Sequence, residues 1–140
     1  MKENTNKQII LVSACLVGLS CRYDGKTKTS QPCLKALAGK VWVPVCPEQL
    51  GGLPTPRTAA RLTGGDGFQV LNGTAKVMTR DGLDLSAQFI KGARQVLYIA
   101  KALSITQAYL KARSPSCGSS TVAGVTAALL LENGIQVEEF

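Results

Sequence analysis

Short runs of apolar residues predict the buried strands of a sheet. Residues 8–13, 41–45 and 105–110 are rich in branched side chains and are bounded by polar or turn-forming residues. Continuous apolar runs of this kind are typical of parallel strands that are covered on both faces. A shorter run at 135–137, just before an acidic C-terminus, predicts a last strand.

Three helices are predicted between these strands. The first covers residues 31–38, because Ser30 is a good N-cap, a proline stands in the first turn and a glycine follows the end. Another covers residues 124–132 and ends at an Asn-Gly pair. The longest follows a turn at 81–85, and its apolar positions recur at helical spacing, which predicts one buried stripe of Phe89, Ala93, Val96, Leu97, Ala100 and Leu103.

A β-hairpin is predicted before the longest helix. Residues 68–71 and 74–78 flank Asn72-Gly73, a pair that two-residue type I′ turns favour because both residues accept positive φ. Strands separated by helices, with this hairpin as an excursion, indicate a single α/β domain over residues 1–140 with a mostly parallel, Rossmann-like layered sheet. Residues 1–7 are polar, and we expect them to form a flexible N-terminus.

The cysteine and histidine counts restrict the chemistry. The chain has five cysteines and no histidine. An odd number of cysteines without a signal-peptide pattern favours free thiols, a metal site or catalysis over disulfides, and it favours a cytoplasmic location. The lack of histidine excludes Cys-His zinc sites, Cys-His nucleophile pairs and Ser-His-Asp triads. A metal would therefore be held by thiolates.

Charge and hydropathy exclude some partners and leave others open. No segment is long and apolar enough to cross a membrane. The formal charge of +7 attracts anions of any class, but no run of five or more basic residues occurs. A nucleic-acid surface is therefore possible without being favoured, and the sequence does not indicate an oligomeric state.

Three cysteines follow three of the predicted strands. Cys15, Cys46 and Cys117 each lie within a few residues of a strand end, and the carboxyl ends of parallel strands lie along one edge of a sheet. We therefore expect three thiols to meet there. Three soft thiolates suit an iron-sulfur cluster or, less well, zinc, although cysteines also often belong to the core. Cys21 could supply a fourth ligand, whereas Cys33 is expected to be a buried apolar residue of a helix.

Polar residues beside this edge suit proton transfer and binding. Glu48 is the carboxylate best placed to act as a general acid or base. Ser114 and Ser116 could hydrogen-bond a substrate or water, or only satisfy the turn around a proline. Asp24 and Arg57 are candidates for substrate binding. Arg57 could instead tie down its proline-rich loop, and an Asp-Gly turn explains Asp24 more simply.

Six short motifs span nearly the whole chain in a fixed order. They are Val-Ser-Ala-Cys-Leu at 12–16, Arg-Tyr-Asp-Gly at 22–25, Val-Cys-Pro-Glu at 45–48, Gly-Gly-Leu-Pro-Thr-Pro-Arg at 51–57, Lys-Ala-Arg-Ser-Pro-Ser-Cys-Gly at 111–118 and Gly-Val-Thr-Ala-Ala-Leu-Leu at 124–130. With these motifs the chain resembles the bacterial domain of unknown function 523 family, whose characterised function is that of a thiouracil desulfidase.

The resemblance implies a cofactor and a reaction. It implies a 4Fe-4S cluster held by Cys15, Cys46 and Cys117, with one iron free to take sulfur from a small thiolated substrate. Glu48 and Ser114 would then be the acid/base and substrate-positioning groups. The implied reaction is a non-redox desulfuration, in which water adds to the thiocarbonyl carbon and sulfur leaves as the carbonyl forms.

Two positions depart from the family pattern or vary within it. Cys21 falls where the family admits other residue types, which argues against its being a ligand. Family members usually carry a longer loop before the Gly-Val-Thr-Ala-Ala helix, whereas only residues 119–123 intervene here. A shorter loop at the rim of the pocket would affect substrate size and the exclusion of water.

Two other functions are compatible with the residues. One is a non-catalytic iron-sulfur or zinc protein, such as a sulfur carrier or sensor, which would bind metal yet release no sulfide. The other is an RNA-associated protein that acts on thiolated tRNA nucleotides, for which salt-dependent RNA binding would be the sign.

Overall fold

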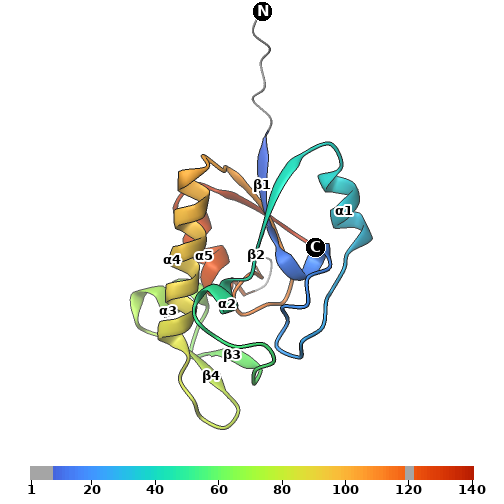
Figure 1. Cartoon of the computed structure of the whole chain (residues 1–140). Helices are drawn as coiled ribbons and strands as arrows, with labels where there is room; N and C mark the ends of the chain where they lie inside the picture. Colours follow the sequence, from blue (N-terminus) through green and yellow to red (C-terminus); the bar gives the residue numbers. More distant parts are fainter. Residues whose placement is uncertain (1–7, 119–121) are drawn as a thin grey trace, which may run out of the picture.

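A parallel sheet forms the centre of the molecule (Figure 1). The computed structural model describes residues 8–118 and 122–140, and within these ranges the sheet has four strands in the order β2-β1-β5-β6, each parallel to its neighbours. The strands are β1 (Ile9–Ser13), β2 (Val41–Val45), β5 (Gln107–Leu110) and β6 (Gln136–Glu139). The predicted α/β fold with a mostly parallel sheet is confirmed.

The position of each strand in the sheet explains how far it is buried. Residues 10–12 of β1 are fully buried, as expected for an inner strand with helices on both faces. The prediction that β2 is equally buried is wrong, because Val41 and Trp42 are 44% and 38% exposed. β2 is an edge strand of the sheet, which also explains why it accommodates Pro44.

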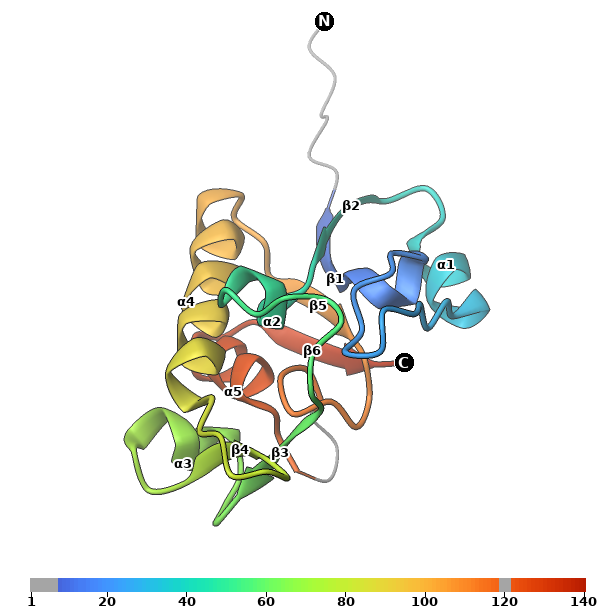
Figure 2. The ribbon, with the colours of Figure 1, turned by 60° about the horizontal axis from the view of Figure 1, so that its bottom comes forward.

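Helices cover the two faces of the sheet (Figure 2). On one face, α4 (Ser86–Ala102) and α5 (Val125–Glu132) pack against each other and against a core that includes Leu11 and Leu110. On the other face, α1 (Gln31–Leu37) covers a second core formed with Ile10 and Val12. Alternate residues of β1 therefore point into different cores, as the pleat of a strand requires.

The predicted helices are confirmed with small changes at their ends. Ser30 caps α1, since its Oγ accepts a hydrogen bond from the Cys33 backbone N at 3.2 Å. Asp84 accepts a hydrogen bond from the backbone N of Ser86 at the start of α4. Most of the apolar stripe of α4 is buried, whereas Leu103, just past the helix end, is 42% exposed.

The predicted hairpin at 68–78 is wrong in its location. Residues 67–72 form the helix α3 (Gly67–Asn72), because Asp66 and Gln69 make a reciprocal capping box at its start. Gly73 has a φ of 88° and ends this helix, so the Asn-Gly pair serves as a helix end instead of a turn. The antiparallel excursion does exist, but β3 (Ala60–Thr63) and β4 (Lys76–Thr79) form it.

Two short helices follow strand ends that carry cysteines. The 3-10 helix η1 (Ala14–Val17) follows β1 directly. Helix α2 (Pro47–Leu50) follows β2 and carries Glu48 in its first turn. Proline in the first turn favours a helix here, because its fixed φ suits that position.

Two predictions concern residues outside the described ranges. These are the flexible N-terminus at 1–7 and residues 119–121 of the short loop before α5. Among the helices of the described ranges, none has the length and apolar character needed to span a membrane.

Candidate functional site

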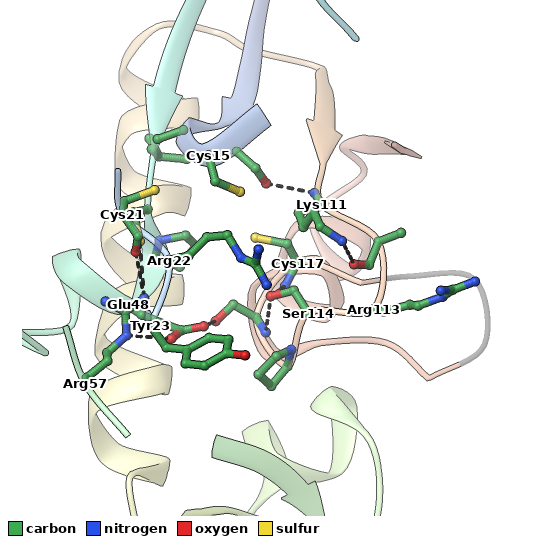
Figure 3. A pocket seen from close by; sticks show the side chains of 18 residues that line it. Cys15, Cys21, Arg22, Tyr23, Glu48, Arg57, Lys111, Arg113, Ser114 and Cys117 are labelled. Carbon is green, nitrogen blue, oxygen red and sulfur yellow. Dashed lines mark hydrogen bonds and ion pairs between the residues drawn. The ribbon is translucent and has the colours of Figure 1, made fainter. Parts of the chain in front are cut away.

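The carboxyl ends of β1, β2 and β5 border one pocket (Figure 3). It has a cavity volume of about 140 Å³, far more than a single water molecule occupies. Its wall includes residues 13–15 at the end of β1, residues 45–48 at the end of β2 and residues 111–117 after β5. This is the edge of a parallel α/β sheet where ligands bind.

The structure brings the three predicted cysteines together in this pocket. Cys15, Cys46 and Cys117 all line it, and Cys21 lines it as well. The five cysteines all lie in the described ranges and are all free. Cys33 is a residue of α1 and is fully buried in the second core, as predicted.

Hydrogen bonds among the thiols favour two thiolates. A hydrogen bond with Cys21 lowers the pKa of Cys46 to about 6, helped by the Gln49 backbone and the Arg57 charge and opposed by burial. A hydrogen bond with Cys21 also lowers the pKa of Cys15. The pKa of Cys21 is raised, chiefly by its hydrogen bonds with Cys15 and Cys46, to one of which its single S–H donates at a time. The thiol form is therefore favoured at Cys21, and the thiolate form is favoured at Cys15 and Cys46 relative to an ordinary cysteine.

Cys117 differs from the other two predicted ligands. It is 4% exposed, and burial raises its pKa to about 12. Its Sγ forms a hydrogen bond with Ser13, whose Oγ also accepts a hydrogen bond from the Lys111 backbone N at 2.9 Å. Metal binding would have to displace the proton of this thiol, as is usual for cysteine ligands.

The donor set suits a cluster better than a single ion. Across residues 8–118 and 122–140, no three Cys, Asp or Glu side chains converge closely enough to hold one metal ion. Cysteine ligands of an iron-sulfur cluster bind different irons, so they do not need to converge on one point. Three thiols around a pocket, two of them favouring the thiolate, therefore fit a cluster.

Glu48 lies in a fixed orientation at the start of α2 (Figure 3). Its Oε1 accepts a hydrogen bond from Arg57 Nε at 2.9 Å, and its Oε2 accepts one from Ser116 Oγ at 3.1 Å. Its side chain is 17% exposed and that of Arg57 is 6% exposed. The carboxylate is thus partly buried, paired and held at both oxygens.

The two serines have different partners. Ser114 Oγ accepts hydrogen bonds from the backbone N atoms of Ser116 and Cys117, each at 3.1 Å, so it shapes the turn that carries Cys117. Ser116 is 1% exposed and donates to Glu48. Ser116 therefore contacts the proposed acid/base group directly, whereas the hydrogen bonds of Ser114 are to the backbone of its own turn.

Asp24 does not line the pocket. Its side chain is exposed and accepts a hydrogen bond from the Lys26 backbone N at 3.0 Å, which is the turn-stabilising contact expected of an Asp-Gly sequence. Its role in substrate binding stays a prediction without a contact at the pocket.

Three further cationic side chains, which the sequence did not single out as site residues, also line the pocket. Arg22, Lys111 and Arg113 line it, and the Arg22 guanidinium lies 5.6 Å from the centre of the Tyr23 ring. Burial, together with Lys28, Arg22 and Arg113, lowers the pKa of Lys111. All three lie inside the sequence motifs at 22–25 and 111–118, and this position could have indicated them as pocket residues.

Comparisons with known proteins identify similar sequences and a similar fold. The model of the 2-thiouracil desulfurase family matches residues 10–139. The uncharacterized protein YbbK of Bacillus subtilis (strain 168) is 43% identical, over 92% of this chain and 93% of its own length. The solved structure of the 4Fe-4S-dependent thiouracil desulfidase TudS (DUF523Vcz) superposes with a TM-score of 0.81 at 40% identity, covering 95% of this chain and 91% of that one.

Proposed function

This chain belongs to the 2-thiouracil desulfurase family, and we propose that it removes sulfur from a small thiouracil-like substrate without net oxidation or reduction. The observation that supports this most strongly is the pocket itself, where Cys15, Cys46 and Cys117 surround a cavity that also contains Glu48. The overall reaction converts C=S and water into C=O and hydrogen sulfide, so no electrons are gained or lost.

We propose that Cys15, Cys46 and Cys117 hold a 4Fe-4S cluster. Support comes from the thiol-rich pocket, the absence of histidine from the sequence and the 4Fe-4S dependence in the name of the similar protein TudS. When bound, such a cluster would supply iron that prefers the soft sulfur of the substrate to the oxygen of the product.

Glu48 is the proposed general acid and base. Its Oε2 receives one hydrogen bond from Ser116 Oγ, and a carboxylate oxygen can accept a second. We expect Oε2 to take a proton from the water as the water oxygen bonds to the thiocarbonyl carbon. The C–S bond then breaks as the proton on Oε2 passes to the departing sulfur. The added hydroxyl gives its own proton to the freed Oε2 as the carbonyl forms, and this second proton completes hydrogen sulfide.

The pocket cations suit the leaving group. Arg22 and Lys111 lie close enough to Cys15 to lower its pKa, so they also favour negative charge on other sulfur atoms in the pocket. Sulfur leaves with developing negative charge, and preorganised cations stabilise such charge as it appears.

The cytoplasmic location of the protein stays a prediction. Free thiols at Cys15, Cys21 and Cys46 suit the reducing cytoplasm that the sequence predicts.

An isotope experiment tests the proposed reaction. The protein is reconstituted anaerobically with iron and sulfide and incubated with 2-thiouracil in ¹⁸O-labelled water. We expect sulfide and uracil in equal amounts, with one ¹⁸O in each uracil, and neither product from Cys117→Ala. A cluster-loaded protein that releases no sulfide would contradict the proposal and favour a sulfur carrier or sensor.

A further inference from the structure

Arg57 is a buried cation whose hydrogen-bond donors are all used. A guanidinium has five N–H donors in a fixed plane. Nε donates to Glu48 Oε1 at 2.9 Å. Nη1 donates to Pro54 O at 3.1 Å and to Thr55 Oγ1 at 2.9 Å. Nη2 donates to Cys21 O at 2.9 Å and approaches Cys46 Sγ at 3.9 Å. Within the described ranges, each of the five donors thus has a protein acceptor.

These contacts join segments that are distant in sequence. The guanidinium connects the loop after β1, the end of β2, helix α2 and the residues just before Arg57 itself. Its backbone N also donates to Tyr23 O at 2.8 Å, so both main chain and side chain hold the loop after β1. Arg57 lies at the point where these segments meet (Figure 3).

We propose that Arg57 is a positioning residue that fixes the Glu48 carboxylate relative to the Cys46 sulfur, and that it does not bind substrate. This inference rests on the proposed function for its activity readout. A substrate would need to displace one of five protein acceptors from a side chain that is only 6% exposed. Of the two roles that the sequence leaves open for Arg57, substrate binding and holding its proline-rich loop, the proposal takes the second and extends it to Glu48.

The arrangement also explains which oxygen of Glu48 faces the chemistry. Arg57 occupies Oε1, and the other oxygen, Oε2, is left to Ser116 and the pocket. Rotation of the carboxylate would break the charge-assisted bond to Arg57 Nε. Arg57 therefore selects Oε2 as the atom that exchanges protons.

Lysine cannot reproduce this geometry. A lysine ammonium carries its three donors on one atom, so it cannot reach Glu48, the Cys21 carbonyl and the proline-rich loop at once. Arg57→Lys therefore keeps the positive charge but no longer holds the Glu48 carboxylate in one orientation. The matched control is Arg94→Lys, which makes the same change on the exposed face of α4.

Steady-state kinetics of the reconstituted protein separate positioning from binding. With rates expressed per cluster iron, we expect Arg57→Lys to lower kcat for 2-thiouracil about 100-fold, the size of effect that a misplaced group causes. KM should change less than about twofold, because substrate binding is not affected. Arg94→Lys should leave both constants unchanged. A raised KM with an unchanged kcat would overturn the proposal.

A second measurement does not need activity, iron or a substitution. In the wild-type chain without cluster, ¹⁵N NMR should show the Arg57 Nε–H exchanging with water far more slowly than the Arg94 Nε–H. Adding uracil should leave the Arg57 resonance in place. Fast exchange at Arg57, or a shift on adding uracil, would overturn the positioning role even if the desulfuration itself were confirmed. If the wild type releases no sulfide, the proposed function fails while this measurement still decides the role of Arg57.

Discussion

The Cys21 thiol forms hydrogen bonds with Cys15 and with Cys46. The thiol form is favoured at Cys21, so Cys21 has the properties of a donor more than of a ligand. This arrangement explains how two thiols can favour the thiolate although burial opposes that charge at both.

Removal of the Cys21 thiol should make Cys46 less acidic. Its hydrogen bond is the largest cause of the low pKa of Cys46, which is about 6. In the cluster-free chain, site-resolved mass spectrometry of alkylation by iodoacetamide should give a midpoint near that value. In Cys21→Ala the midpoint should move to higher pH, because the thiolate loses a donor. A wild-type midpoint close to that of an ordinary thiol would contradict this account.

Replacement of the Glu48 carboxylate should slow the reaction without removing the cluster. Glu48→Gln keeps the shape of the side chain but removes the atom that we expect to accept a proton. Loss of a general acid or base typically costs about 100- to 10,000-fold in rate. The reconstituted variant should retain its iron and lose kcat for 2-thiouracil to this extent. Glu132→Gln, at the exposed end of α5, is the matched control, and equal activity in both variants would exclude Glu48 from the mechanism.

Single residues differ in how far the sequence predicts them. The meeting of Cys15, Cys46 and Cys117 follows from strand patterns and the geometry of a parallel sheet. The five donors of Arg57 could not be assigned in advance, because their acceptors are mostly carbonyls and side chains of irregular segments. Every residue has a backbone carbonyl, so the sequence does not show which carbonyls accept hydrogen bonds from Arg57.

At the scale of secondary-structure elements, two glycines allow α2, the helix that carries Glu48, to pack closely against α4. A Cβ on Gly92 would overlap the Pro47 carbonyl oxygen, and one on Gly51 would overlap the Gln88 carbonyl oxygen. The two backbones therefore approach more closely than side chains would permit. Gln95 Nε2 also donates to Leu50 O at 2.6 Å, which holds the end of α2 against α4.

Gly92→Ala should therefore destabilise the fold and displace α2. Overpacking of a tight contact typically costs about 1–3 kcal/mol. Urea unfolding should show this loss in the free energy of unfolding, and the desulfuration rate should fall because Glu48 moves with α2. Lys91→Ala, one residue earlier on the exposed side of α4, should change stability by less than about 0.5 kcal/mol. An unchanged stability of Gly92→Ala would show that α2 does not pack as closely as described.

Elements with strong periodicity are predictable from the sequence, and short ones are not. The 17 residues of α4 repeat an apolar stripe over several turns, so their helix is unambiguous. Residues 67–72 contain only six residues with a mixed pattern, and the Asn-Gly pair after them suits both a hairpin and a helix end. The capping box between Asp66 and Gln69 decided in favour of the helix.

At the scale of the whole molecule, strand order determines the site. The strands β2, β1 and β5 are neighbours, and each leads into a segment that carries one of the three cysteines. The segments after β1 and β5 are the farthest apart in sequence, yet these two strands lie side by side in the sheet. The sequence predicts this edge from the α/β pattern, whereas the order of the strands is known only from the structure.

The iron content of single-cysteine variants tests the central claim most directly. After anaerobic reconstitution, wild type, Cys33→Ala and Cys21→Ala should each bind about four irons per chain, the number in a 4Fe-4S cluster. Cys15→Ala, Cys46→Ala and Cys117→Ala should lose the cluster and its visible absorption. Full iron content in any of these last three variants, or none in wild type, would contradict the assignment of the cluster to this pocket.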